Sequence, residues 1–291
     1  MNDSRDVLER ASAIAGLDAG GARLLRVGSN TVYRLQAPVI ARISRPGADA
    51  GHVSRTVAVA QWLEAAGYPA VRLADVDQPV VIDGQAVTFW QAVSDDSDQY
   101  ASVAEVAEVL LRLHQLTAPA ELHLPELAPF ANAQKRIESN TWLTPDDRAF
   151  LLAMLTQMQA AYAGLQFTLP PGVIHGDASI GNVLRDTDGH PVVIDLDGFA
   201  VGPREWDVAL TAIYYDSFGW HTRREYQDFV RVYGYDIMTW PGYPVMRAVR
   251  EFLMVTWVIQ KAPESGPAAA EAAKRITALR TGASRKDWQP Y

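Results

Sequence analysis

The feature that most constrains the fold is the segregation of strand and helix patterns along the 291-residue chain. Short runs of β-branched and apolar residues, the pattern of strands, lie within residues 1–93. Amphipathic helical periodicity dominates residues 94–291. Because runs of strands followed by runs of helices are typical of α+β proteins, we predict that class, with an N-terminal antiparallel sheet and a mostly helical C-terminal region.

The N-terminal part predicts a sheet of about five strands. Gly28-Ser29-Asn30 joins the first two strands, and Asp83-Gly84, a strong hairpin-turn signal, joins the last two. Gly67 followed by Pro69 ends the helix that is inserted after the third strand. We predict strands over 24–27, 31–36, 39–44, 80–82 and 86–90, and helices over 4–15 and 52–66.

The polar segment Ser94-Asp95-Asp96-Ser97-Asp98 is interpreted as a linker between two lobes, and a solvated loop is an equally simple description. A β-hairpin interrupts the helical region after it, and residues 284–291 are expected to form a loose tail. We predict helices over 102–116, 145–165, 205–216, 222–233, 244–261 and 267–280, and hairpin strands over 183–185 and 191–196.

Composition excludes several classes of function. Lys and Arg number 26 against 34 Asp and Glu, a net charge of −8, whereas a nucleic-acid binder needs a basic surface. The chain has no cysteine, which excludes disulfides and thiolate metal sites. No apolar run approaches the roughly 18 residues that span a bilayer. We expect a cytoplasmic protein with neither nucleic acid nor membrane as partner, and the acidic charge is compatible with a cationic ligand.

Oxygen-bearing side chains gather around the predicted hairpin. Asp177 and Asn182 lie in the loop that enters it, and Asp195 lies at the end of the returning strand. Because a tight turn places the two strands side by side, Asn182 and Asp195 are expected at the same end of the hairpin, opposite the turn. Such ligands suit Mg²⁺, which takes one or two carboxylates together with substrate phosphates. Asp177 is then free to accept a proton from a hydroxyl, which completes a set of groups for phosphoryl transfer.

Two motifs in this stretch resemble those of the aminoglycoside phosphotransferase family. His175-Gly176-Asp177 precedes Asn182, and Ile194-Asp195-Leu196-Asp197 follows after the hairpin. The family belongs to the protein-kinase-like group, with choline, homoserine and fructosamine kinases, and the resemblance extends over nearly the whole chain. It implies a two-lobed protein-kinase-like fold, with a nucleotide-binding lobe over 1–93 and a catalytic and substrate-binding lobe over 94–291.

The resemblance also implies roles for individual residues. Asp177 matches the catalytic base, and Asn182 and Asp195 match the Mg²⁺ ligands, with ATP or GTP as co-substrate. His175 is expected to hold the loop by hydrogen bonds, and Asp207 to orient it from the start of a helix. Asp197 lies two residues beyond Asp195 on a segment predicted to be extended, so it should face the same side. It could assist a second metal, bind substrate or cap the following turn.

In the N-terminal lobe the resemblance implies contacts to the nucleotide. The backbone of Gly28, Ser29 and Asn30 would contact phosphate oxygens, although the same residues also describe an ordinary hairpin turn. Backbone groups of Gln91 and Val93 would face the nucleobase.

Two positions of that lobe depart from the family pattern. Arg42 stands on the third strand where the family has a lysine that binds the α/β-phosphates. Thr56 stands in the following helix where a glutamate anchors that cation. Either Arg42 contacts phosphate without an anchor, or another acid such as Asp49 or Glu64 replaces the glutamate.

The sequence therefore predicts an ATP- or GTP-dependent small-molecule kinase that transfers the γ-phosphate to a hydroxyl. The family suggests an aminoglycoside or similar amino-bearing, cationic acceptor, in which case antibiotic resistance is a possible consequence. A primary metabolite that bears a hydroxyl is the alternative acceptor, because this fold group hosts many substrates. Acids on the later helices could bind its amines, although such acids more often form a solvated face. These candidates are Asp216, Glu225, Asp228, Glu251 and Glu264. The alternative is a regulatory nucleotide-binding module that has lost catalysis. The departures at Thr56 and Arg42 favour this alternative, whereas the presence of Asp177, Asn182 and Asp195 argues against it.

Overall fold

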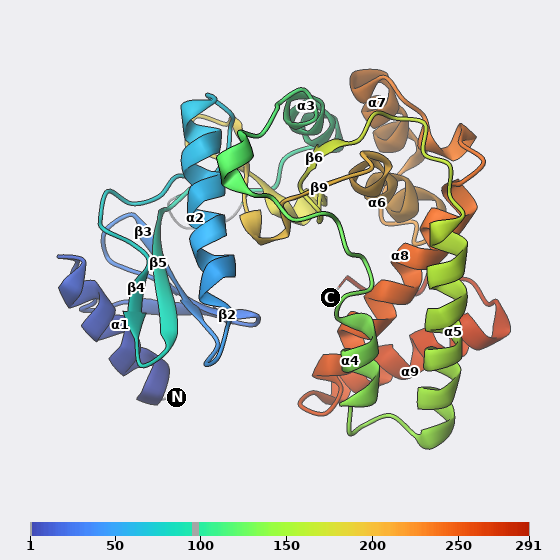
Figure 1. The fold of residues 1–291 in the computed structure, drawn as a ribbon, viewed down its shortest axis with the longest axis horizontal. Coiled ribbons are helices and arrows are strands. Elements are labelled where there is room, and N and C mark those ends of the chain that lie inside the picture. The colour runs from blue at the N-terminus through green and yellow to red at the C-terminus, as the bar shows by residue number, and fades with distance from the viewer. Residues whose placement is uncertain (1, 95–98, 291) are drawn as a thin grey trace. The chain divides into compact units, whose positions relative to one another are not determined.

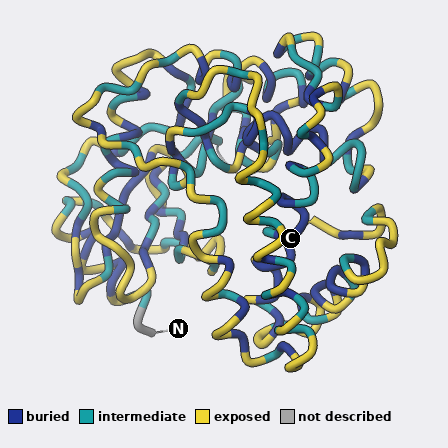
Figure 2. The backbone as a smooth tube through the Cα atoms, turned by 45° about the vertical axis from the view of Figure 1, so that its right-hand side comes forward, coloured by how far each residue is buried: buried dark blue, intermediate teal, exposed yellow. Residues whose placement is uncertain are grey.

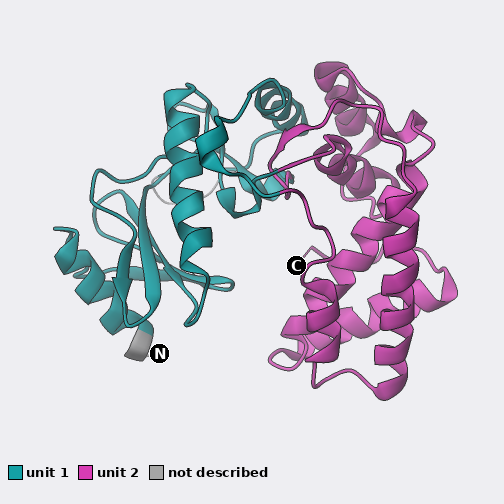
Figure 3. Ribbon diagram, in the orientation of Figure 1, with its two compact units in different colours: residues 1–125, 179–200 teal, residues 126–178, 201–291 magenta. Residues whose placement is uncertain are grey.

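The computed structural model describes residues 2–94 and 99–290 and divides the chain into two compact units (Figure 3). Unit 1 comprises residues 1–125 and 179–200, and unit 2 comprises 126–178 and 201–291. These divisions differ from the predicted lobe boundary at 93/94, because residues 99–125 contact the hairpin, α2 (Ala50–Ala65) and the segment that follows α2. The assignment of functional lobes stays a prediction. The predicted linker, apart from Ser94, lies outside the described residues.

Unit 1 is built on a five-stranded antiparallel sheet with the strand order β1-β2-β3-β5-β4 (Figure 1). The predicted strands and turns are confirmed. Asp83 and Gly84 both have positive φ, 48° and 78°, as a tight hairpin turn of this type requires. The strands are β1 (Arg23–Val27), β2 (Asn30–Arg34), β3 (Val39–Ser44), β4 (Val80–Ile82) and β5 (Gln85–Gln91).

Two helices flank this sheet (Figure 1). Val39, Ala41 and Ile43 of β3 join the buried cluster that includes residues of α1 (Asn2–Ile14). Because side chains alternate across a strand, Arg42 lies on the opposite face, which is the face of α2 (Ala50–Ala65). The period of two in β3 thus separates an apolar core from a face that presents a cation.

The hairpin of β7 (Val183–Arg185) and β8 (Pro191–Val193) belongs to unit 1 and is tied to two other parts of it. The amide of Val193 donates to the carbonyl of Pro69, and the amide of Val71 donates to the carbonyl of Val193, each at 2.8 Å. Arg185 forms an ion pair at 2.6 Å with Glu105 of α3 (Val103–Leu113). The same Glu105 completes the predicted capping box with Ser102.

Unit 2 is mostly helical, with α8 packed against α4, α5, α6 and α9. Met246, Val249, Phe252 and Val255 of α8 are fully buried at helical spacing, and Figure 2 shows how burial varies along the backbone. The sequence did not predict α4, β6 or β9, all of six residues or fewer. The elements are α4 (Ala133–Glu138), α5 (Pro145–Ala163), β6 (Gly172–Ile174), β9 (Ala200–Gly202), α6 (Glu205–Asp216), α7 (Arg223–Tyr233), α8 (Tyr243–Val258) and α9 (Gly266–Thr281).

The C-terminal segment is not the loose tail that the sequence predicted. Trp288 is only 1% exposed, and its ring stacks on Phe218 with centroids 5.4 Å apart. The guanidinium of Arg275 lies 4.8 Å from the centre of the Trp288 ring and donates to the carbonyl of Gln289 at 2.6 Å. One large aromatic side chain thus holds the segment against unit 2, an effect that local sequence polarity does not reveal.

Glu105 gives a test of how firmly the hairpin is held. Burial raises the pKa of Glu105, but hydrogen bonds from Arg185 and Ser102 outweigh this effect and lower the pKa to about 2. A carboxyl with a lowered pKa stabilises the fold above its usual pKa and loses that effect as the pH falls toward the folded-state pKa. We expect Glu105→Gln to lower the free energy of unfolding at pH 7 by about 1–3 kcal/mol. The difference from wild type should shrink below pH 4 and disappear near pH 2.

Urea denaturation at several pH values measures this difference. Glu108→Gln, which removes an exposed carboxylate from the same helix, is the matched control and should change little. A loss of stability that is equal at pH 7 and pH 3 would contradict the ionic origin of the contact.

Candidate active site

The loop that carries Asp177 is held in unit 2 by a fully buried carboxylate. Asp207, near the start of α6, accepts the amide of His175 at 2.7 Å and the amide of Gly176 at 2.9 Å. Gly176 has a φ of 88°, which side-chain-bearing residues rarely adopt, so the loop depends on glycine here. His175 is buried, and its Nδ1 accepts the amide of Asp177 at 3.3 Å. These contacts accord with the structural roles expected for Asp207 and His175.

A residue that the sequence analysis missed lies beside Asp177. Arg250 of α8 approaches the Asp177 carboxylate at 3.7 Å, and its side chain is 8% exposed, whereas that of Asp177 is 63% exposed. The guanidinium also lies 4.3 Å from the centre of the Trp206 ring. Burial lowers the pKa of Arg250, and the charge of Asp177 opposes that effect. The Asp177 carboxylate is thus exposed to solvent and lies beside a buried cation.

The signal for Arg250 was present but weak in the sequence. It is an arginine within the otherwise apolar run Val249 to Val258, interrupted only by Glu251 and Thr256. Such a position implies a buried charge that needs a partner. The partner is on another element, so helical periodicity alone could not identify it.

In unit 1 the hairpin brings Asn182 and Asp195 to the same end, as the sequence predicted. The register pairs Val183 with Val193, and beyond it the amide of Ile194 donates to the carbonyl of Asn182 at 2.9 Å. Asp195 is the next residue. A carboxylate and a carboxamide at one hairpin end form a donor set that suits a hard cation such as Mg²⁺.

The backbone leaves the extended conformation at Asp195, which corrects the predicted strand over 191–196. Strand β8 ends at Val193, and Asp195 adopts φ 59° and ψ 62°, followed by a 3₁₀ turn over Leu196–Gly198. A left-handed non-glycine residue costs about 1–3 kcal/mol and often occurs at functional sites. The turn, rather than an extended strand, directs Asp195 and Asp197 toward the same arginine.

That arginine is Arg42. Its Nη2 atom donates to Oδ2 of Asp197 at 2.6 Å and lies 3.4 Å from Oδ1 of Asp195. The hydroxyl of Thr56 lies 3.2 Å from Oδ1 of Asp197. The two acids that the sequence offered as substitutes lie elsewhere: Asp49 caps α2 by accepting the amide of Gly51, and Glu64 lies 3.9 Å from Arg72. The acid that contacts Arg42 most closely thus comes from the segment after the hairpin.

The predicted phosphate loop is the turn between β1 and β2. The amide of Gly28 donates to the carbonyl of Asn30 at 3.0 Å, and Arg45 donates twice to the carbonyl of Gly28. Nδ2 of Asn30 lies 3.5 Å from Oδ2 of Asp197. The turn and the Arg42 pair are therefore adjacent within unit 1, whereas the nucleotide role of Gly28, Ser29 and Asn30 stays a prediction.

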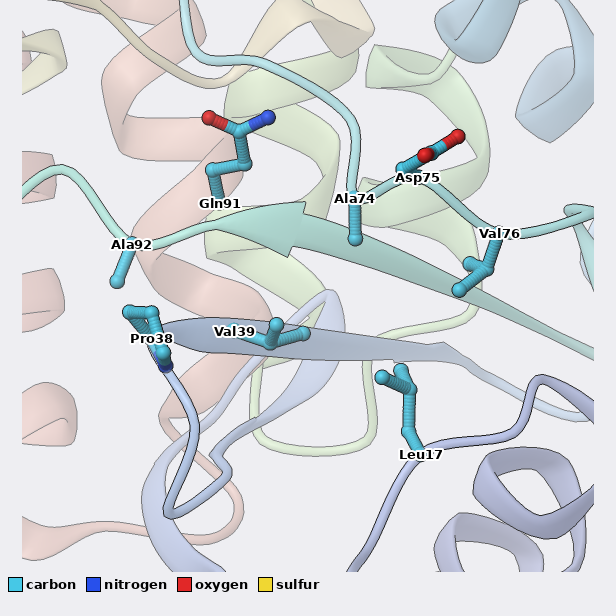
Figure 4. A pocket seen from close by; sticks show the side chains of 8 residues that line it. All are labelled: Leu17, Pro38, Val39, Ala74, Asp75, Val76, Gln91 and Ala92. Carbon is cyan, nitrogen blue, oxygen red and sulfur yellow. The ribbon is translucent and has the colours of Figure 1, made fainter.

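The residues predicted to face the nucleobase are Gln91, the last residue of β5, and Val93, which follows the strand. The amide of Gln91 donates to the carbonyl of Arg72 at 2.8 Å, and its side-chain amide donates to the carbonyl of Leu73. Gln91 and Ala92 line a mostly apolar hollow of about 350 Å³ together with Val39, which faces the α1 side of the sheet (Figure 4). This hollow is therefore on the face opposite Arg42. Contacts of Gln91 and Val93 with a nucleobase stay a prediction.

Four of the five acids that the sequence offered for binding amines contact other groups of unit 2. The fifth, Glu264, is exposed in the turn before α9 rather than on a helix, which corrects its predicted position. Asp216 pairs with Arg247, and Glu251 accepts from Ser217 and from Arg285. Asp228 pairs with Arg231, and Glu225 completes a capping box with Thr222. Residues 126–178 and 201–291 contain 15 acids and 15 Lys and Arg, so the net charge of −8 resides in unit 1. These four carboxylates are thus neutralised or used as caps rather than left available for amines.

Comparison with known proteins gives the class of this chain. A family model described as the phosphotransferase enzyme family matches residues 22–249. The chain therefore belongs to this family. Over 47 residues it is 51% identical to the probable ketoamine kinase of Lactiplantibacillus plantarum, a match that spans 16% of this chain and 16% of that protein.

Solved structures of small-molecule kinases share the fold. An amicoumacin kinase in complex with AMP-PNP, Ca²⁺ and Ami aligns with a TM-score of 0.76 at 14% identity, covering 99% of this chain and 96% of that one. A microcompartment-associated aminopropanol kinase aligns with a TM-score of 0.71 at 16% identity, covering 94% of each chain. The α+β, protein-kinase-like fold that the sequence predicted is therefore confirmed. Within residues 2–94 and 99–290, no helix is long and apolar enough to cross a membrane.

Asp207 offers a direct test of how the loop is held. Asp207→Ala leaves two buried amides without an acceptor, so we expect the free energy of unfolding to fall by about 2–5 kcal/mol. Asp207→Asn keeps one carbonyl oxygen and should lose less. Chemical denaturation measures both values, and Asp228→Ala, which removes a surface acid from α7, is the control. Equal losses in the three variants would contradict the bracing role of Asp207.

Proposed function

We propose that this protein is a Mg²⁺-dependent kinase that transfers the γ-phosphate of ATP or GTP to a hydroxyl of a small molecule. The observation that carries the proposal is the state of Asp177, an exposed carboxylate on a loop braced by Asp207 and charge-paired with the buried Arg250. Membership of the phosphotransferase enzyme family supports the same conclusion. Asp177 would accept the proton of the acceptor hydroxyl as the phosphoryl group is transferred.

A divalent cation would be held by Asn182 and Asp195. Their positions at one end of the hairpin provide a carboxylate and a carboxamide oxygen, which are hard ligands. When bound, Mg²⁺ supplies charge neutralisation on the nucleotide phosphates. The amicoumacin kinase of similar fold was solved in complex with AMP-PNP and Ca²⁺, which supports this assignment.

The nucleotide would be bound through the side of the sheet that presents Arg42. Arg42 would neutralise phosphate charge, and the turn at Gly28, Ser29 and Asn30 would offer backbone amides. Gln91 and Val93 would contact the nucleobase through their backbone. Because a guanidinium offers a planar fork of donors, Arg42 can replace a lysine while changing the geometry of the contact.

The acceptor would be an amino-bearing compound with few positive charges. The neutral balance of unit 2 and the pairing of Asp216 with Arg247 and of Glu251 with Arg285 leave little negative charge for a polycation. The sequence predicted a cationic acceptor, and these pairs favour a singly charged amino alcohol over an aminoglycoside. The aminopropanol kinase among the structures of the same fold is compatible with this preference.

Removing the proposed base tests the reaction. We expect Asp177→Asn to lower kcat by about 10²- to 10⁴-fold, because general-base catalysis contributes that much, while nucleotide affinity stays unchanged. ADP or GDP release with Mg²⁺ measures turnover, and Asp146→Asn, whose carboxylate is 89% exposed, is the control. If the variant retains full activity, Asp177 is not the base. A wild-type protein that binds nucleotide but releases no product, even to water, would favour the regulatory module instead.

The charge of the acceptor can be tested with matched compounds. We expect singly charged amino alcohols to have a kcat/KM about tenfold or more above that of polycationic aminoglycosides, since about 1.4 kcal/mol of discrimination gives that ratio. Initial rates across a panel that includes 1-amino-2-propanol, choline and kanamycin measure it. Efficient phosphorylation of kanamycin alone would refute the preference and support the aminoglycoside prediction.

A further inference from the structure

We infer that Asp197 is the positioning residue of Arg42, in the role that the family resemblance assigns to a glutamate at position 56. The inference rests on the proposed function, because Arg42 is taken to bind the nucleotide phosphates. Because the chain has threonine at position 56, another group must hold that cation.

The geometry of the Asp197 carboxylate supports the inference. Its Oδ2 atom accepts the guanidinium of Arg42 at 2.6 Å, and its Oδ1 atom lies 3.2 Å from the hydroxyl of Thr56. Nδ2 of Asn30 approaches Oδ2 from the turn between β1 and β2 at 3.5 Å. One carboxylate therefore joins β3, α2 and the predicted phosphate turn, all within unit 1.

The surroundings explain why Arg42 needs such a partner. Its side chain is 15% exposed, and its guanidinium lies 5.9 Å from the centre of the Trp90 ring. A largely buried cation without a carboxylate would bear an uncompensated desolvation cost. A charge-assisted hydrogen bond offsets that cost and also directs the planar fork, because its donors have fixed geometry.

Thr56 completes the arrangement. It is buried on α2, and its hydroxyl lies within hydrogen-bond distance of both Asp197 and the carbonyl of His52. A short hydroxyl at this position leaves room for Asp197 to reach Arg42 from the 3₁₀ turn. A glutamate here would bring a second carboxylate to the same guanidinium.

The same contacts separate Asp197 from the proposed metal ligands. Both carboxylate oxygens of Asp197 face groups of the protein, whereas Asp195 approaches Arg42 only at 3.4 Å. Of the three roles that the sequence left open for Asp197, none described an anchor for Arg42. We therefore assign Asn182 and Asp195 to the metal and Asp197 to the cation.

A mutant cycle between positions 197 and 56 tests the inference. We expect Asp197→Asn to raise the Kd of a fluorescent ATP analogue about tenfold, because a charge-assisted contact is lost. Thr56→Glu alone should also weaken binding by placing two carboxylates together. The double variant Asp197→Asn/Thr56→Glu should recover most of the wild-type affinity, since the new carboxylate reaches Arg42 from α2. This reversal of sign is not expected from a merely structural residue.

The measurement is made with Mg²⁺ and again with EDTA, and circular dichroism confirms folding. Glu64→Gln, which removes an exposed carboxylate from α2, should leave the Kd unchanged. If Asp197→Asn does not fold, Thr56→Val takes its place, and the loss of its hydroxyl should raise the Kd severalfold.

Two results would overturn the inference. One is a double variant that binds no better than Asp197→Asn. The other is a loss of affinity on Asp197→Asn that occurs with Mg²⁺ but not with EDTA, which would make Asp197 a metal ligand. If wild type binds nucleotide but transfers no phosphate, the proposed function fails while the cycle still decides the role of Asp197. If wild type binds no nucleotide, the inference is overturned together with the proposed function.

Discussion

The backbone pairing of the β7–β8 hairpin is the constraint on which the site in unit 1 depends. Because Val183 pairs with Val193, Asn182 and Asp195 come to one end of the hairpin, and another register would separate them along its length. The hairpin does not keep this register alone. Main-chain bonds to Pro69 and Val71 and the ion pair between Arg185 and Glu105 attach it to the rest of unit 1. A short hairpin, marginal by itself, is therefore stabilised by its neighbours.

Two aspartates outside the proposed chemistry hold the groups that would carry it out. Asp207 uses its carboxylate to accept two loop amides next to Asp177 in unit 2. Asp197 uses its carboxylate to hold Arg42 in unit 1. Both depend on the same physical fact, which is that a carboxylate forms strong, directed hydrogen bonds with N–H donors. Arg250 complements them by pairing with the carboxylate of Asp177.

Local pattern predicted most of the secondary structure, for reasons that can be named. The five strands of the main sheet have clear turns, and the capping box at Ser102 and Glu105 places the start of α3. The missed β6 and β9 are three residues long, too short for any periodicity. The predicted loose tail was wrong because Trp288 stacks on Phe218, a contact between residues that are 70 positions apart. The predicted end of β8 was wrong because the chain turns after Ile194, where Asp195 adopts a left-handed conformation.

The sequence by itself determined the α+β order of elements and the chemical groups of the candidate site, since Asp177, Asn182 and Asp195 lie close along the chain around one hairpin. Their roles remain predictions. Only the tertiary structure decided which acid pairs with Arg42 and which cation lies beside Asp177. Asp197 is 155 residues from Arg42, and Arg250 lies on a helix far along the chain from the loop that carries Asp177. No local periodicity encodes such partners, because they are selected by the packing of separate elements and by the cost of burying an unpaired charge.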